Sequence, residues 1–259
     1  GHYISTADGD DLISFDFLQK MYMSCYSRGG TSVIFPEYIM AFGDQGYVWK
    51  YSDLSKIGRS SFFSYHPYIS RVFCKRELFD KIKYRDARIG SGFAYEDWHF
   101  NCECLASGYF FAIARGAILF YRQRSGSLLR QANAELSRLI PDSEYFKPNN
   151  FLKLCWSELA DGLSIDAPST KFSVSDFINT PGVVELVAAA NNIDPAISLG
   201  ILKNQHAGTN FQPIDSATRA YFEVCRLISG GTFTDVVILP FLTKGGAEKY
   251  ILSVLHALQ

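Results

Sequence analysis

The sequence lacks a run of basic residues and an excess of either charge. Its 25 lysines and arginines stand against 26 aspartates and glutamates, which gives a formal net charge of −1. Proteins that bind nucleic acid present clustered positive charge to the phosphates, so we expect no nucleic-acid partner. Charged residues make up 20% of the chain and apolar residues 47%, a balance typical of a globular protein and not of a disordered one.

Long apolar runs are missing as well. The longest, residues 109–121, is interrupted by Arg115 and is shorter than the roughly 20 residues that a membrane-spanning helix needs. The sequence shows no signal peptide, and Gly1-His2 resembles the remnant of a cleaved tag. We therefore expect a cytoplasmic protein, with peripheral contact at the inner face of the cell membrane left open.

The six cysteines form no CxxC pair. Cys102 and Cys104 fall on a predicted helix, where residues two apart point in different directions and cannot share a metal ion. A chain of 259 residues can also bury a core without disulfide bonds. We expect reduced thiols, as in a cytosolic protein.

Three aspartates stand between a predicted strand, residues 3–7, and a predicted helix, residues 12–26. They belong to the acidic run 8–11, DGDD, at the carboxyl end of the strand, where open α/β sheets bind ligands. Asp8 and Asp10 supply hard oxygen ligands suited to Mg²⁺ or Mn²⁺, especially beside a phosphate. The alternative, a helix cap with further acids in the turn, explains one aspartate well and three poorly.

A second acidic pair opens a predicted helix that runs from residue 95 to Gly108. Glu96 and Asp97 fall in its first turn, next to Trp98. Because the helix dipole stabilises negative charge there, the pair should be ionised, and an ionised carboxylate beside a groove is a candidate general base. Acids that merely favour a helix start are the alternative.

A basic, hydroxyl-rich segment, residues 121–127, follows an apolar strand. Arg122 and Arg124 share one face of the strand because strand side chains alternate. They could hold a phosphate or be solvated charges on an edge strand, and the residues leave the two equally open. If the helix and the strand pack antiparallel, the segment faces the Glu96-Asp97 pair. Such a site would deprotonate a hydroxyl group and also hold an anion.

The remaining patterns indicate an α/β fold, a mixed sheet with flanking helices, followed by a mostly helical region. Lone histidines such as His66 and His99 are expected in structural roles. The residues before Gly92 are flexible enough for a loop that moves over a ligand. The predicted elements are two strands within 30–51 joined by the turn 43–46, a helical turn at 53–57, strand 68–75 with helix 76–82, and helices at 134–140, 151–159, 182–191, 195–202 and 216–228, with caps at Ser173 or Ser175 and at Asp215.

Together these motifs resemble the second half of an inverting family-two glycosyltransferase of the GT-A fold. The resemblance covers residues 3–130 and rests on the order and spacing of four features: the DGDD run 8–11, the strand and helix 69–82, the stretch YEDW at 95–98 and the segment YRQRSGS at 121–127. It implies that Asp8 and Asp10 hold a metal ion, Mn²⁺ or Mg²⁺, and the diphosphate of a nucleotide sugar. It also implies that Asp97, beside Glu96, deprotonates the acceptor hydroxyl.

The same resemblance assigns substrate contacts to Trp98 and to the segment 121–127, which would close over the diphosphate through Tyr121, Arg122, Arg124 and Ser127. The family often has histidine where Arg124 stands. It also begins with a βαβ half that holds the base, whereas this chain starts one strand ahead of Asp8. We therefore expect the isolated chain to bind a nucleotide sugar poorly and to be inactive.

The final residues, 234–259, form a predicted βα unit with a Gly245-Gly246 turn that resembles the start of a family-four glycosyltransferase of the GT-B fold. A turn of this kind could cradle a phosphate or simply join a strand to a helix. The predicted organisation is therefore the C-terminal half of a GT-A domain at 3–130, a helical linker or interaction region at 131–230, and the first βα unit of a GT-B-like domain at 231–259.

The resemblance implies part of a bacterial enzyme that transfers a sugar from a nucleotide-sugar donor to a glycan or lipid-linked acceptor during synthesis of surface polysaccharide, O-antigen or capsule. Transfer would be metal-dependent and would invert the anomeric carbon. An alternative is a non-catalytic module that docks two transferase domains or forms a homo-oligomer, since a half-domain would expose a sheet edge. A weaker alternative is a metal-dependent phosphate-handling enzyme without a sugar.

Overall fold

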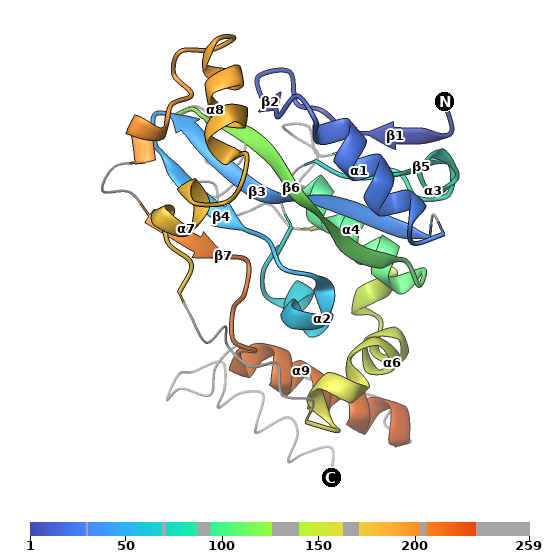
Figure 1. The fold of residues 1–259 in the computed structure, drawn as a ribbon. Helices are drawn as coiled ribbons and strands as arrows, with labels where there is room; N and C mark the ends of the chain where they lie inside the picture. The colour runs from blue at the N-terminus through green and yellow to red at the C-terminus, as the bar shows by residue number, and fades with distance from the viewer. Residues whose placement is uncertain are drawn as a thin grey trace.

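The computed structural model describes residues 1–29, 31–68, 71–86, 94–125, 140–162, 171–202 and 206–231. Within them the fold is mixed α/β, with a central sheet of parallel and antiparallel strands and helices around it (Figure 1). The predicted α/β class with a mixed sheet and flanking helices is confirmed. Several predicted features lie outside the described residues: Ser127, the helix at 134–140, the boundary at residue 130 and the βα unit with Gly245-Gly246.

The sheet is organised around β3 (Ser32–Gly43). On one edge, β3 pairs in parallel with β6 (Phe110–Gln123) over almost its whole length. On the other edge it pairs antiparallel with β5 (Phe73–Lys75) near its start and with β4 (Tyr47–Lys50) near its end. Three short strands complete the described sheet: β1 (Tyr3–Ser5) beside β5, β2 (Leu12–Ile13) beside β6 and β7 (His206–Thr209) beside β4.

β3 is a buried central strand because almost every position in it is apolar. All its residues but Gly43 are buried, as expected for a strand covered on both faces. Its register against β6 shifts between Pro36 and Tyr38, at a proline that has no N–H to donate. Glu37 is buried at this bulge, where it accepts hydrogen bonds from the guanidinium group of Arg115 (3.0 Å) and from the N–H of Gly116 (2.8 Å).

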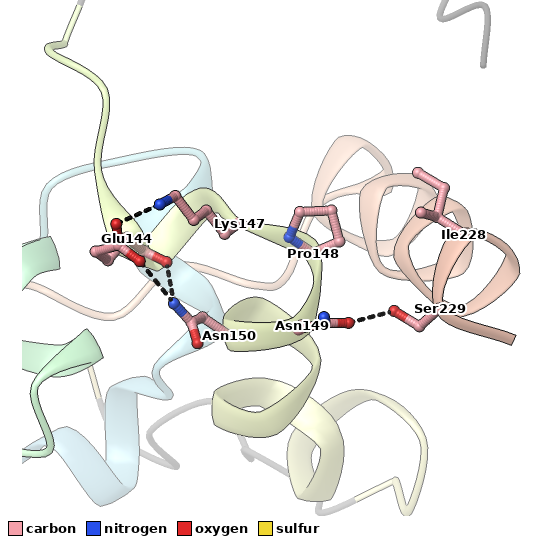
Figure 2. A pocket seen from close by; sticks show the side chains of 7 residues that line it. All are labelled: Glu144, Lys147, Pro148, Asn149, Asn150, Ile228 and Ser229. Atoms are coloured by element: carbon pink, nitrogen blue, oxygen red, sulfur yellow. Dashed lines mark hydrogen bonds and ion pairs between the residues drawn. The ribbon is translucent and has the colours of Figure 1, made fainter. Parts of the chain in front are cut away.

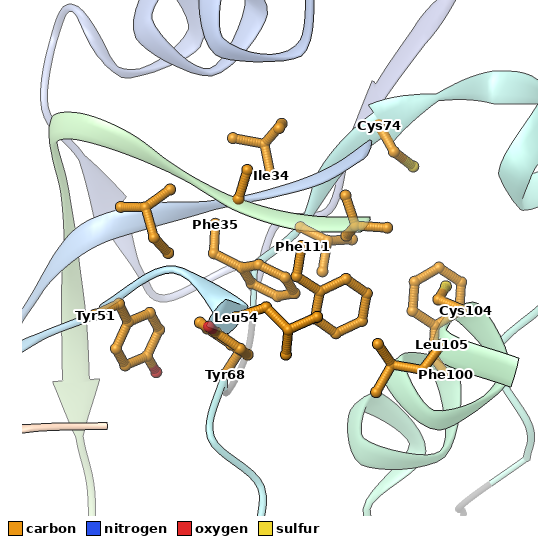
Figure 3. Packing of buried hydrophobic residues seen from close by; sticks show 14 of the residues in the cluster. Ile34, Phe35, Tyr51, Leu54, Tyr68, Cys74, Phe100, Cys104, Leu105 and Phe111 are labelled. Carbon is orange, nitrogen blue, oxygen red and sulfur yellow. The ribbon is translucent and has the colours of Figure 1, made fainter. Parts of the chain in front are cut away.

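Helices cover both faces of the long strands. One cluster joins β3 and β6 to α1, α4, α6 and α9, and its aromatic centre stacks Phe35 on Tyr68, with ring centroids 4.6 Å apart and Phe111 edge-on (Figure 3). The other cluster packs α7 and α8 against Tyr38, Met40 and neighbouring residues. The described helices are α1 (Phe17–Tyr26), α2 (Leu54–Ile57), α3 (Arg76–Lys81), α4 (Glu96–Ala106), α6 (Pro148–Leu159), α7 (Val174–Ile178), α8 (Val183–Asn191) and α9 (Ser216–Gly230), with 3-10 helices η1 (Ser60–Phe63), η2 (Glu144–Phe146) and η3 (Leu199–Leu202).

The helix predicted over residues 12–26 begins only at Phe17. Leu12–Ile13 form β2 against β6, and the N–H of Ser14 continues this pairing to the carbonyl oxygen of Ile118 at 3.0 Å. Apolar residues at this spacing suit a helix and also a short edge strand, and the tertiary pairing decides between them. The acidic run 8–11 therefore lies between two strands, and the helix begins five residues later than the sequence predicts.

The region that follows β6 packs closely against the sheet. β7, which the sequence does not predict, runs parallel to β4 in the same sheet. In Figure 1, α7 and α8 lie over one end of the long strands, and α6 and α9 pack against each other below the sheet. Two predicted caps are confirmed: Ser173 begins α7 in a reciprocal capping box with Asp176, and the Asp215 side chain accepts from the N–H of Thr218 at the start of α9.

Candidate functional site

The acidic run 8–11 lies against the carboxyl end of β6. The backbone N–H of Arg122 donates to the Asp11 carboxylate at 2.9 Å, and its side-chain Nε donates to the carbonyl oxygen of Asp10 at 3.1 Å. The guanidinium group of Arg124, largely exposed, lies 3.3 Å from the Asp10 carboxylate. The structure therefore brings the first acidic motif and the basic segment together, although they are more than a hundred residues apart in the chain.

The charges of the second acidic pair act on the same region. The pKa of the Tyr121 hydroxyl is raised, first by burial and then by the negative charges of Asp11, Asp8, Asp97 and Asp10. Burial also raises the pKa of Glu96, although a backbone hydrogen bond opposes the shift, and the charges of Asp97 and Asp8 raise it further. The charges of the acidic run and of Asp97 therefore both act on Tyr121.

The three aspartates of the run differ in their surroundings. The side chain of Asp11 is only 1% exposed, and burial raises its pKa to about 6 against the opposing hydrogen bond from Arg122. Its Oδ2 atom, 3.8 Å from the guanidinium group of Arg71, has no hydrogen-bond partner. Asp8 is exposed and Asp10 is partly exposed. The sequence contains all three aspartates but does not show which of them is buried. It therefore does not identify Asp11 as the one that is buried and bonded to β6.

Asp8 and Asp10 can supply part of a metal site. Carboxylate oxygens suit Mg²⁺ and Mn²⁺, and both of these carboxylates are open to solvent to some degree. Across the described ranges, no group of three or more His, Cys, Asp or Glu side chains gathers as a metal site. The donor set fits an ion whose remaining ligands come from a phosphate or from water.

Arg122 is already engaged within the protein. Its guanidinium group lies over the Phe42 ring, 4.5 Å from the centroid, and bonds to the carboxylate of Asp194, just after α8. Each of the two arginines therefore forms an ion pair with an aspartate: Arg122 with Asp194, and Arg124 with Asp10. The second pair is exposed, and exposed ion pairs contribute only about 0–1 kcal/mol. Of the two guanidinium groups, that of Arg124 is the easier to redirect to an anion.

The α4 helix begins from a strained residue. Tyr95 has φ 61° and ψ 47°, and it is the one residue other than glycine with positive φ among those described. This left-handed conformation costs about 1–2 kcal/mol in an L-residue, and such strain gathers at functional sites. Immediately after it, Glu96 and Asp97 start the helix as predicted, and an Asp97 oxygen accepts from the N–H of Trp98 at 2.9 Å.

His66 contacts Asp97, which the sequence did not predict. Its ring lies parallel to that of Trp98 with centroids 5.8 Å apart, and its Nδ1 is 3.5 Å from Asp97 Oδ2. On its other side, the Asn101 amide nitrogen donates to His66 Nε2 at 2.7 Å and to the Tyr68 carbonyl oxygen at 3.0 Å. Since Nε2 accepts, the single proton of the neutral ring sits on Nδ1 and faces Asp97.

Burial keeps His66 neutral. It lowers the pKa of the imidazole, although the nearby charge of Asp97 acts in the opposite direction. Because the unfolded chain takes up this proton at a higher pH than the folded protein does, the free energy of unfolding rises with pH up to about 6.5 through this group. His66 therefore faces the Asp97 carboxylate as a neutral imidazole. No local sequence signal pairs residue 66 with residue 97.

A separate hollow of about 630 Å³ lies between the start of α6 and the end of α9 (Figure 2). Its polar groups bond to one another: Lys147 and Asn150 with Glu144, and Ser229 Oγ with the side-chain oxygen of Asn149 at 2.8 Å. The described polar side chains of this hollow are therefore already paired within the protein.

No protein-family model matches the chain, and no curated protein matches it either. Among the described residues, no helix is both long enough and apolar enough to span a membrane. All six cysteines are buried and free of disulfide bonds.

Proposed function

We propose that the chain forms part of a metal-dependent, inverting glycosyltransferase with a GT-A-type site, acting in the cytoplasm at the inner face of the membrane on surface polysaccharide. One observation carries the proposal: the acidic run 8–11 is hydrogen-bonded to the end of β6 through Arg122, whose N–H donates to Asp11 and whose Nε donates to the Asp10 carbonyl oxygen. The negative charge of Asp97 acts on the same region, since it contributes to the raised pKa of Tyr121. Motifs that are far apart in the sequence therefore lie close together, which supports the resemblance to family-two transferases.

In the proposed reaction, Asp97 removes the proton of an acceptor hydroxyl, with His66 holding the carboxylate in place. The acceptor oxygen forms a bond to the anomeric carbon of the donor sugar while the bond to the nucleoside diphosphate breaks on the opposite side, which inverts that carbon. Mn²⁺ or Mg²⁺ held by Asp8 and Asp10 would neutralise charge on the leaving diphosphate. Arg124, once released from Asp10, would bind the same phosphates.

Titration calorimetry with Mn²⁺ and UDP tests the diphosphate site without requiring turnover. We expect weak binding of UDP that depends on Mn²⁺ and is lost in the double variant Asp8→Ala/Asp10→Ala. Asp80→Ala/Asp161→Ala, which removes two exposed carboxylates elsewhere, is the matched control and should bind as the unaltered protein does. Equal binding by the two double variants would contradict the assignment of the metal site.

An interaction module is the second candidate, and α1 favours it. Large apolar side chains are exposed along this helix and just before it: Phe15 is 77% exposed, Met23 57% and Tyr26 65%, with Leu18 and Tyr22 between them. Surfaces of this kind mark contacts with other proteins. Analytical ultracentrifugation distinguishes the two functions. A dimer that is broken by Leu18→Glu/Met23→Glu would support the module, and a monomer at all concentrations would exclude self-association.

A further inference from the structure

A second cavity, of about 510 Å³, lies beside the proposed catalytic site. Its size falls within the roughly 300–1,000 Å³ that is typical of small-molecule sites. Four aromatic side chains line it, three from β4 and the residue after it and one from the loop after η1: Tyr47, Trp49, Tyr51 and Tyr65. Aromatic rings with polar edges provide flat apolar faces together with hydrogen-bonding groups.

Four residues that line the cavity carry side-chain amides: Gln45, Gln123, Asn210 and Gln212. Two histidines, His66 and His206, also line it, and among the described lining residues none is Asp, Glu, Lys or Arg. An amide side chain can donate and accept hydrogen bonds, which suits hydroxyl groups that also do both. An anionic ligand would instead call for arginine or lysine. The lining therefore favours an uncharged ligand that presents many hydroxyl groups on a ring with an apolar face.

One wall of the cavity is built by a segment distant in sequence. β7 pairs with β4 from Tyr47↔His206 to Lys50↔Thr209. Beyond the strand, the Asn210 side-chain oxygen accepts from the N–H of Ser52 at 2.9 Å, and the hydroxyl group of Tyr65 donates to the Asn210 carbonyl oxygen at 3.3 Å. The N–H of Gln212 returns a hydrogen bond to the Tyr65 oxygen at 3.1 Å. These bonds fix the wall in place in the absence of a ligand.

The cavity adjoins the proposed catalytic base. His66 lines it and also lies 3.5 Å from the Asp97 carboxylate. Gln123, another lining residue, ends β6 two residues after Tyr121. A ligand in the cavity would therefore lie next to the acid that removes a proton from an acceptor hydroxyl.

We propose that this cavity binds the uncharged sugar of the acceptor, with the aromatic rings stacked on the sugar and the amides bonded to its hydroxyl groups. The acceptor role rests on the proposed transferase function, whereas the binding of an uncharged sugar does not. The segment around β7 thereby helps to determine which acceptor is used, although it lies far from the acidic motifs in the sequence.

Saturation-transfer NMR on the whole chain tests the proposal. The probes are glucose, galactose, mannose, N-acetylglucosamine, lactose and maltose, with glucuronic acid as the charged counterpart. We expect transfer from aromatic protons to at least one uncharged probe, with weaker transfer to glucuronic acid. Gln212→Trp fills the cavity from an exposed position and should weaken that binding at least tenfold, whereas Gln19→Trp, an equally exposed change on α1, should leave it unaltered.

Transfer to none of the six probes, or equal transfer in the Gln212→Trp and Gln19→Trp proteins, would overturn the proposal. Circular dichroism of both variants confirms that the fold is retained. The outcome is separate from that of the transferase hypothesis. If the protein binds a sugar but substitutions at Asp97 do not change its transfer activity, the assignment of the cavity stands and the proposed reaction is refuted. If substitutions at Asp97 abolish transfer but no sugar binds in the cavity, the proposed reaction stands and the assignment of the cavity as a sugar site is rejected.

Discussion

Asp97→Asn is expected to lower the rate of sugar transfer by about 10²–10⁴-fold, the range that a positioned general base contributes. The amide keeps the size of the carboxylate and an oxygen that can accept from the N–H of Trp98, but it cannot take up the proton of the acceptor hydroxyl. The assay measures release of nucleoside diphosphate. It uses this chain joined to a nucleotide-binding half of a family-two transferase, so that the donor can bind.

Glu96→Gln is the matched control, because it makes the same isosteric change at the preceding, more exposed residue. Its effect should be several-fold at most. Donor binding, measured by calorimetry with UDP and Mn²⁺, should be unchanged in Asp97→Asn because the acid acts on the acceptor. An Asp97→Asn protein that transfers normally, or one that has lost the donor along with activity, would rule out the assigned role.

Glu158→Ala is expected to lower the free energy of unfolding by about 3 kcal/mol, since it leaves two backbone donors without an acceptor in a largely buried place. Glu158 lies near the end of α6, where its two carboxylate oxygens accept from the N–H groups of Arg59 (2.8 Å) and Ser60 (2.9 Å). These groups begin η1, and Ser60 is fully buried. The same helical turn leads into His66 and the wall of the cavity.

Urea denaturation provides the measurement, with a lower midpoint and an unchanged slope as the expected result. Glu223→Ala removes an exposed glutamate from α9, with its ion pair to Arg226, and should change stability by less than about 0.5 kcal/mol. A loss as small in Glu158→Ala as in this control would show that the carboxylate does not hold η1 in place.

Local signals explain which elements could be predicted from the sequence. The turn at 43–46 between β3 and β4, the helix α6 and the caps at Ser173 and Asp215 depend on residues close together in the chain, and they are confirmed. β7 is four residues long, contains a glycine and has no β-branched residue before its last position. It is a strand because β4 offers it an edge, which no local pattern reveals.

The candidate site likewise has residues that the sequence could predict and contacts that it could not. Asp8, Asp10, Glu96 and Asp97 are acids in recognisable runs, so the sequence proposes them, and the negative charges of Asp8, Asp10 and Asp97 act on Tyr121 in the structure. The engagement of Arg122 by Asp194 and the contact of His66 with Asp97 depend on tertiary packing. The aromatic cavity also escapes sequence reasoning because its lining comes from distant segments, residues 39–67, residue 123 and residues 206–212. The hydrogen bond from Ser52 to Asn210 that supports it joins residues 158 positions apart.

The pairing of β4 with β7 has a consequence for folding. Because closing so long a loop costs chain entropy before any contact compensates for it, strands of this separation join late. During synthesis on the ribosome, β4 would keep an unpaired edge until residue 209 has emerged, and an unpaired edge can recruit a strand from another chain. Pairing of β7 with β4 therefore ends the interval in which this edge can cause aggregation. The same pairing completes the wall of the proposed sugar site.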